Sequence, residues 1–109
     1  MELAHLLINS LATLDAPRHN VQEVVDATRS VTGFDIRRHT RRREYVSARA
    51  VAAYVARCAG NPLNAIAEGL GLHHSSVVHL VRLMEQALSL STMYPDYIDL
   101  YNKLTTILK

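Results

Sequence analysis

The chain has 109 residues, of which 49% are hydrophobic, and a formal net charge of +2. This length suits one globular domain with a modest core and leaves little room for a second. The aromatic residues are five Tyr and one Phe, without Trp, so Leu, Val, Ile and Ala must form most of the core. That composition favours an all-α fold, and we expect a single domain over residues 1–109, built as a compact bundle of about five or six helices.

The single cysteine, Cys58, excludes an internal disulfide and the zinc frameworks that need paired cysteines. The opening MELAHLLINSLATLD lacks a basic start and its apolar residues are spaced, so we expect neither a signal peptide nor a membrane span. These features favour a cytoplasmic protein without a membrane partner. The sequence has no G-x-x-x-x-G-K-[ST] loop, so we expect no nucleotide and no other cofactor.

Apolar residues at three- and four-residue steps predict helices along most of the chain. The first predicted helix, over residues 1–15, has one face of leucines: Leu3, Leu6, Leu7, Leu11 and Leu14. This face would either complete the core as an added packing element or form the seam of a homodimer. A second helix is expected to begin after the capping residue Asn20 and to end at Gly33.

The third predicted helix runs from about Arg43 to Cys58 and has two different sides when its residues are placed at 100° steps. The side expected to face the core consists of Ala48, Ala52, Tyr54, Val55, Cys58 and Ala59. The other side consists of Arg49, Ala53, Ala56 and Arg57. We expect this second side to be an outer surface of small residues flanked by arginines, which another backbone can approach closely.

Three more helices are predicted after the break at AGNP. The first is the short segment LNAIAEGL, which ends at Gly71, and the second runs from about His74 to Ser89. A further break at TMYP precedes a last amphipathic helix from Asp96 to Leu108. No strand or internal repeat is indicated.

Most of the arginines are concentrated in one region, which contains a single acidic residue, Glu44, whereas the rest of the chain is acidic overall. The region contains seven arginines: Arg37, Arg38, Arg41, Arg42, Arg43, Arg49 and Arg57. A solvated loop is the usual outcome for a charge cluster, but such an asymmetry also builds a positive surface that attracts a polyanion.

The segment IAEGLGLHHSSVVHLV has the pattern of a helix-turn-helix. Such a motif needs a small residue where the helices cross, a glycine in the turn and an apolar residue facing back, and Ala67, Gly71 and Val77 satisfy these demands. On the opposite side of the second helix lies a polar row: Ser75, His79, Arg82 and Gln86. These side chains are suited to hydrogen-bond base edges or phosphates.

The longer stretch RRREYVSARAVAAYVARCAGNPLNAIAEGLGLHHSSVVHLV resembles the C-terminal DNA-binding domain of the bacterial replication initiator DnaA, which belongs with the Trp repressor-like helix-turn-helix superfamily. The resemblance covers about residues 21–109. It implies a nucleoid-associated protein that binds double-stranded DNA in a sequence-specific way and acts in transcription regulation or in the control of replication initiation.

The family's signature histidine falls on His74 and its two hydroxyl residues fall on Ser75 and Ser76, whereas His73 stands in place of its aspartate. The residues expected in the major groove are His73, His74, Ser75, Ser76, His79 and Arg82. The residues expected at phosphates or in the minor groove are Arg42, Arg43, Arg49, Arg57 and Asn64. The family's own minor-groove arginine falls near Ser47, with Arg43 and Arg49 as neighbouring replacements.

Four other interpretations compete with this one. Ser75 and Ser76 would serve simply as N-caps of the helix, although their position after the turn favours capping and DNA contact together. Metal binding is not expected, because His74 and His79 are five residues apart and point about 140° from each other on a helix. Catalysis is not expected, because Cys58 lies in an alanine-rich face without an oxyanion-type loop. The last alternative is a protein-protein interaction adaptor that keeps the helix-turn-helix fold without DNA binding.

Overall fold

The computed structural model describes residues 17–109, and within this range every regular element is a helix. The elements in chain order are α2 (Val21–Thr32), α3 (Arg43–Cys58), α4 (Leu63–Leu70), α5 (His74–Ser89), the short 3₁₀ helix η1 (Ser91–Met93) and α6 (Pro95–Ile107). The expected all-α bundle is confirmed. The first predicted helix, over residues 1–15, lies outside the described residues. None of the helices between residues 17 and 109 is long and apolar enough to cross a membrane.

The helix boundaries follow local signals in the sequence. The side chain of Asn20 accepts a hydrogen bond of 2.8 Å from the backbone N–H of Glu23, whose carboxylate accepts one of 3.2 Å from the N–H of Asn20. This capping box satisfies two amide groups at the start of α2. Gly33 ends the same helix with a φ of 83°, which is favourable only for glycine. Only α6 is displaced from its predicted bounds, by one residue at each end, because Pro95 takes its first position.

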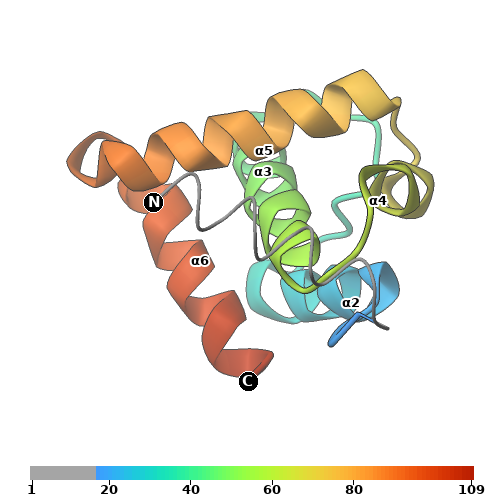
Figure 1. Cartoon of the computed structure of the whole chain (residues 1–109). Coiled ribbons are helices and arrows are strands. Elements are labelled where there is room, and N and C mark those ends of the chain that lie inside the picture. The colour runs from blue at the N-terminus through green and yellow to red at the C-terminus, as the bar shows by residue number, and fades with distance from the viewer. Residues whose placement is uncertain (1–16) are drawn as a thin grey trace.

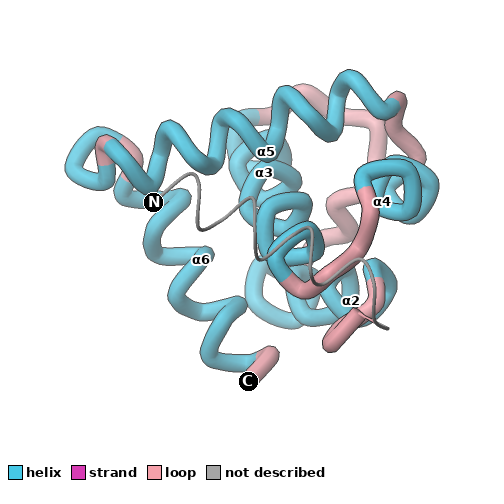
Figure 2. The backbone as a smooth tube through the Cα atoms, in the orientation of Figure 1, coloured by secondary structure: helices cyan, strands magenta, loops and turns pink. Residues whose placement is uncertain are grey.

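α3 is the central helix of the bundle. It contacts α2, α4, α5 and α6, whereas α2 and α5 do not contact each other within the described part of the chain. Figure 1 shows α5 across one side of α3, α2 across the other and α6 along a third. The tube in Figure 2 shows that short loops join these helices, apart from the longer connection between α2 and α3. The core therefore surrounds α3 instead of lying on one side of it.

The prediction of an outer surface on α3 is wrong. Ala53 is 0% exposed and Ala56 is 1% exposed, while Arg49 and Arg57 on the same side are partly exposed, so neighbouring helices cover the alanines that were expected to face outward. The helix period locates two faces but not the number of neighbouring helices, and here helices cover both faces. The short alanine side chains allow these neighbours to approach closely, as the composition indicated.

α4 packs against the start of α2 at a glycine, Gly69. A Cβ atom added to Gly69 would lie 2.4 Å from Cγ1 and 3.0 Å from Cβ of Val21. Such distances are well inside van der Waals contact, and the branched Val21 side chain is itself buried. The absence of a side chain at Gly69 is therefore what allows the two helices to meet.

We expect Gly69→Ala to lower the free energy of unfolding by about 1–3 kcal/mol through overpacking, although alanine is the better helix former. Urea titration followed by circular dichroism measures the change. In the double variant Gly69→Ala/Val21→Ala the loss should be smaller than the sum of the two single losses, because Val21→Ala removes the atoms that collide. Additive losses, or a Gly69→Ala protein as stable as the parent, would contradict the close approach.

Candidate nucleic-acid interface

A three-residue turn, from Gly71 to His73, joins α4 to α5. Gly71 has a φ of 67°, and its N–H donates to the carbonyl of Glu68 over 3.2 Å. The N–H of Leu72 donates to the carbonyl of Ala67 over 2.9 Å. These two bonds form a Schellman motif, which ends α4 and redirects the chain. In Figure 1 α4 is seen nearly end-on while α5 runs across the view, so the two helices cross steeply.

The inner side of the crossing is apolar, as predicted. Val77 faces back into the core and is 0% exposed, and it is joined there by Leu80, Val81 and Met84 of α5 and by Ile66, Ala67 and Leu70 of α4. Burial of these side chains fixes the orientation of α5 relative to α4. Apolar packing thereby sets the position of the outer side of α5.

The outer side of α5 carries the polar row in the expected orientation. The exposed residues at the start of the helix and along its outer side are His73, His74, Ser75, Ser76, His79 and Arg82. Between residues 17 and 109, none of these side chains has a hydrogen bond or ion pair. Gln86 is also exposed, but its amide donates to the hydroxyl of Tyr94 over 3.0 Å. The exposed polar side chains from His73 to Arg82 are therefore unpaired within the described part of the chain.

The capping interpretation of the two serines is wrong. The N-cap of α5 is His73, whose side chain makes no capping bond, and Ser75 and Ser76 lie one and two residues inside the helix. Their hydroxyl groups project from the first turn, beside backbone N–H groups that a helix start leaves without an acceptor. The beginning of α5 thus offers both hydroxyl and amide donors at an exposed position.

The connection between α2 and α3, residues 33–42, is a folded loop. Ile36 inserts into the core and is 1% exposed, and the ring of Phe34 stacks on that of Tyr45 with 4.0 Å between their centroids. The arginine cluster by itself indicated only a solvated or polyanion-binding surface here. Its two apolar residues, Phe34 and Ile36, alternate with charged ones. This alternation was the signal in the sequence that the first half of the loop packs against the core.

Arg49 holds the second half of this loop. Its Nε donates to the carbonyl of Ile36 over 2.8 Å, and its Nη2 donates to the carbonyl of Thr40 over 2.7 Å and to that of Arg38. Its guanidinium also lies 5.9 Å from the centroid of the Tyr45 ring, and partial burial lowers its pKa. Arg49 therefore stabilises the conformation of the loop. Arg57, another expected phosphate contact, is also engaged, because its Nη1 donates to the carbonyl of Asn61 over 3.2 Å.

The remaining charges of the loop are unequal. Arg37 makes a two-pronged contact with Asp35, with 2.8 Å between Nη2 and Oδ2 and 3.0 Å between Nε and Oδ1. Hydrogen bonds from the Arg37 side chain and backbone lower the pKa of Asp35 to about 2, so the carboxylate stays charged and neutralises this arginine. Three other exposed arginines of the loop, Arg38, Arg41 and Arg42, have no ion pair within residues 17–109, and neither does Arg43, the first residue of α3.

Two further expectations concern Asn64 and metal binding. Asn64 is exposed near the start of α4, where its side chain is accessible to a ligand. No cluster of three or more potential metal ligands occurs among residues 17–109.

A helix-turn-helix with an apolar inner side and a polar outer side defines this fold and its candidate site. The helix-turn-helix family of the bacterial DnaA protein matches residues 19–83, more than half of the chain, and the chain therefore belongs to this family of DNA-binding domains. The match includes the basic loop, α3, the turn and most of α5, and the resemblance noted in the sequence is confirmed. Neither the curated proteins nor the solved structures contain a match to the chain.

We expect Arg49→Ala to destabilise the fold by about 1–3 kcal/mol, because three loop carbonyls lose a charged donor. Arg42→Ala is a matched control, since it removes an exposed arginine without an ion pair from the same loop and should change stability by no more than about 0.5 kcal/mol. Chemical denaturation of both variants measures the difference. Equal stability of the two variants would show that Arg49 does not hold the loop.

Proposed function

We propose that this chain binds double-stranded DNA, with the outer side of α5 in the major groove and the basic loop on the phosphate backbone. The observation that carries the proposal is the row of exposed and unpaired polar side chains on the second helix of a helix-turn-helix. Side chains that can hydrogen-bond but find no partner in the protein are suited to an external polar ligand, and this helix is the one that such motifs present to the major groove.

Different residues of the row suit different contacts. Arg82 matches the two acceptors of guanine, and Ser75 and His79 are able to hydrogen-bond base edges on the same side of the helix. His74 and Ser76, in the first turn, lie beside amide groups that suit a phosphate oxygen. His73 replaces the family's aspartate, so this protein presents a histidine where the family presents an acid.

The loop supplies positive charge without base specificity. Arg38, Arg41, Arg42 and Arg43 are exposed, and their charges are not neutralised by ion pairs within the described chain. Phosphate contacts by such residues release counterions from DNA, so affinity falls as salt rises. The loop is also held in shape by Arg49, so its arginines are presented from a defined backbone. We assign direct phosphate contact to the exposed arginines and a positioning role to Arg49.

Arg82→Ala should reduce the affinity for a selected target by about 1–3 kcal/mol and change the affinity for random duplex much less, because a base contact is lost. Fluorescence anisotropy with both duplexes at one salt concentration measures the two losses. The target is obtained by selection from a random duplex library with the parent protein. An equal loss on both duplexes would assign Arg82 to the backbone.

Arg42→Ala should weaken binding to both duplexes alike and reduce the slope of log affinity against log salt by about 1. Lys109→Ala is the control: it removes the same charge from an exposed residue beyond the end of α6, without an ion pair in the described chain, and should leave the slope unchanged. Arg49→Ala should weaken binding with a smaller change of slope than Arg42→Ala, since Arg49 acts through the loop. Identical slopes for Arg42→Ala and the parent would remove the loop from the interface.

The selected sequence also separates the biological roles that belong to this proposal. A sequence like the replication initiator's own DNA box supports control of replication initiation, whereas a palindrome supports a dimeric transcription regulator. Failure to bind any duplex at low salt would contradict the proposal and favour an adaptor that keeps the fold without DNA binding.

A further inference from the structure

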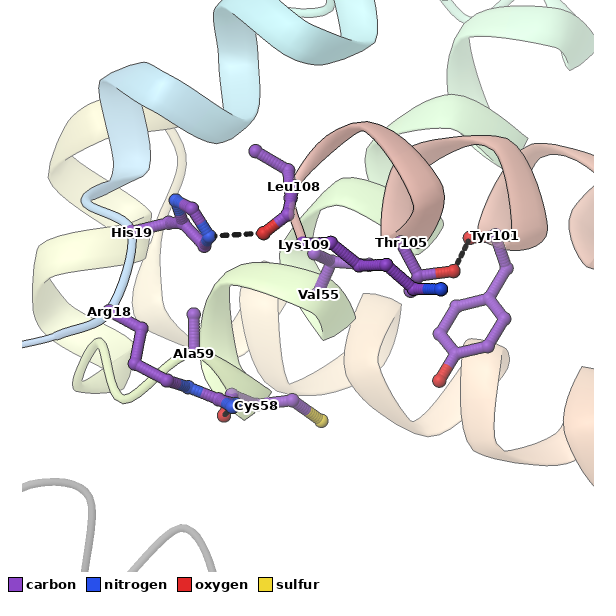
Figure 3. A pocket seen from close by; sticks show the side chains of 9 residues that line it. All are labelled: Arg18, His19, Val55, Cys58, Ala59, Tyr101, Thr105, Leu108 and Lys109. Atoms are coloured by element: carbon purple, nitrogen blue, oxygen red, sulfur yellow. Dashed lines mark hydrogen bonds between the residues drawn. The ribbon is translucent and has the colours of Figure 1, made fainter.

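A cavity of about 340 Å³ lies away from the candidate nucleic-acid interface, between the end of α3, the end of α6 and the residues that precede α2. Figure 3 shows these three segments converging on it. Its lining is mainly apolar: Val55 and Ala59 are buried, while Cys58, Tyr101 and Leu108 are partly exposed. The lining also includes Thr105 and His19, whose Nε2 hydrogen-bonds the carbonyl of Leu108. Partly exposed apolar side chains around a hollow suggest a surface that another apolar segment covers.

The rim of this cavity is basic. Arg18 and Lys109 both line it and are exposed, and neither forms an ion pair within residues 17–109. An apolar hollow with positive charge at its edge fits an amphipathic segment that carries acidic residues. Residues 1–16 contain two acids, Glu2 and Asp15, and no lysine or arginine.

The chain is fixed at the edge of the cavity where residues 1–16 join it. The backbone N–H of Arg18 donates to the carbonyl of Ala59 over 3.0 Å, and its guanidinium donates to the carbonyl of Cys58, also over 3.0 Å. Only Pro17 separates this anchored residue from the N-terminal segment. A segment tethered this closely has a high effective concentration at the cavity, on the order of millimolar or more.

We propose that residues 1–16 dock on this cavity as an amphipathic helix of the same chain, with their leucine face on Val55, Cys58, Tyr101 and Leu108. A helix of 16 residues is about 24 Å long, which fits a body whose shortest dimension is 28 Å. Docking covers the apolar wall and brings the acids of the segment toward the basic rim. The short tether favours the chain's own segment over that of a second copy. This proposal is independent of DNA binding.

The thiol of Cys58 is a built-in reporter, because it is the only cysteine and lines the cavity. An aromatic disulfide reagent that releases a coloured thiolate is added to the folded full chain, and the rate of colour release gives the rate at which this thiol is labelled. Slow labelling indicates a covered cavity. Leu7→Asp and Leu11→Asp place a charge in the leucine face, and we expect each to accelerate labelling at least tenfold. Asn9→Asp, on the opposite side of the predicted helix, is the matched control and should label at the rate of the parent.

Circular dichroism and thermal melting must show that each variant is folded, and Leu7→Ala provides a milder substitution if an aspartate prevents folding. Equal labelling of the parent, the leucine variants and Asn9→Asp would overturn the proposal. Sedimentation over a range of concentrations identifies the occupant. Labelling that slows only as a dimer forms would also overturn it, because the segment of a second copy would then cover the cavity.

Cross-linking provides a second readout that leaves the leucine face nearly intact. In Leu11→Cys and Leu14→Cys the new thiol should form a disulfide with Cys58 on mild oxidation, within a single chain on a non-reducing gel. Asn9→Cys should not. Disulfide formation in neither leucine variant, or only between two chains, would contradict docking on the same chain.

Discussion

The enclosure of α3 is the constraint on which the rest of the structure depends. A helix that contacts four others needs short side chains where its neighbours approach closely, because bulky residues at those positions would hold the helices apart. Ala50, Ala53 and Ala56 meet this demand and are almost fully buried. With α3 in this position, α2 and α5 are held on opposite sides of it, and α6 closes a third side. This arrangement holds the helix-turn-helix in a fixed orientation relative to the rest of the bundle.

The same central helix also shapes the basic loop. Arg49 extends from α3 to three carbonyls of the loop, and Tyr45, one turn earlier, stacks on Phe34. A loop rich in like charges would repel itself open without such anchors. The exposed arginines are consequently carried by a backbone that is fixed from within. Binding of a polyanion would therefore require less ordering of this loop than binding by an unstructured basic tail.

The exposed row on α5 and the Schellman turn before it were predictable because both depend on residues that are close in sequence. Gly71 must take a positive φ, and Val77 and Ser75 must lie on opposite sides of any helix with 3.6 residues per turn. The role of Arg49 was not predictable in this way. An arginine in a basic run looks like its neighbours in the sequence, and only the position of the carbonyls of Ile36, Arg38 and Thr40 distinguishes it.

Local signals in the chain were sufficient for the helix boundaries, the turn and the polar side of α5, since caps, glycines and periodicity act over a few residues. The resemblance to the DnaA helix-turn-helix family was also recognisable in the sequence, and the match over residues 19–83 shows that the chain belongs to it. Three-dimensional packing decided which faces of α3 are covered, why Gly69 must lack a side chain beside Val21, and which arginines remain exposed. These properties depend on contacts between residues that are distant in sequence, and periodicity within one helix contains no information about its neighbours.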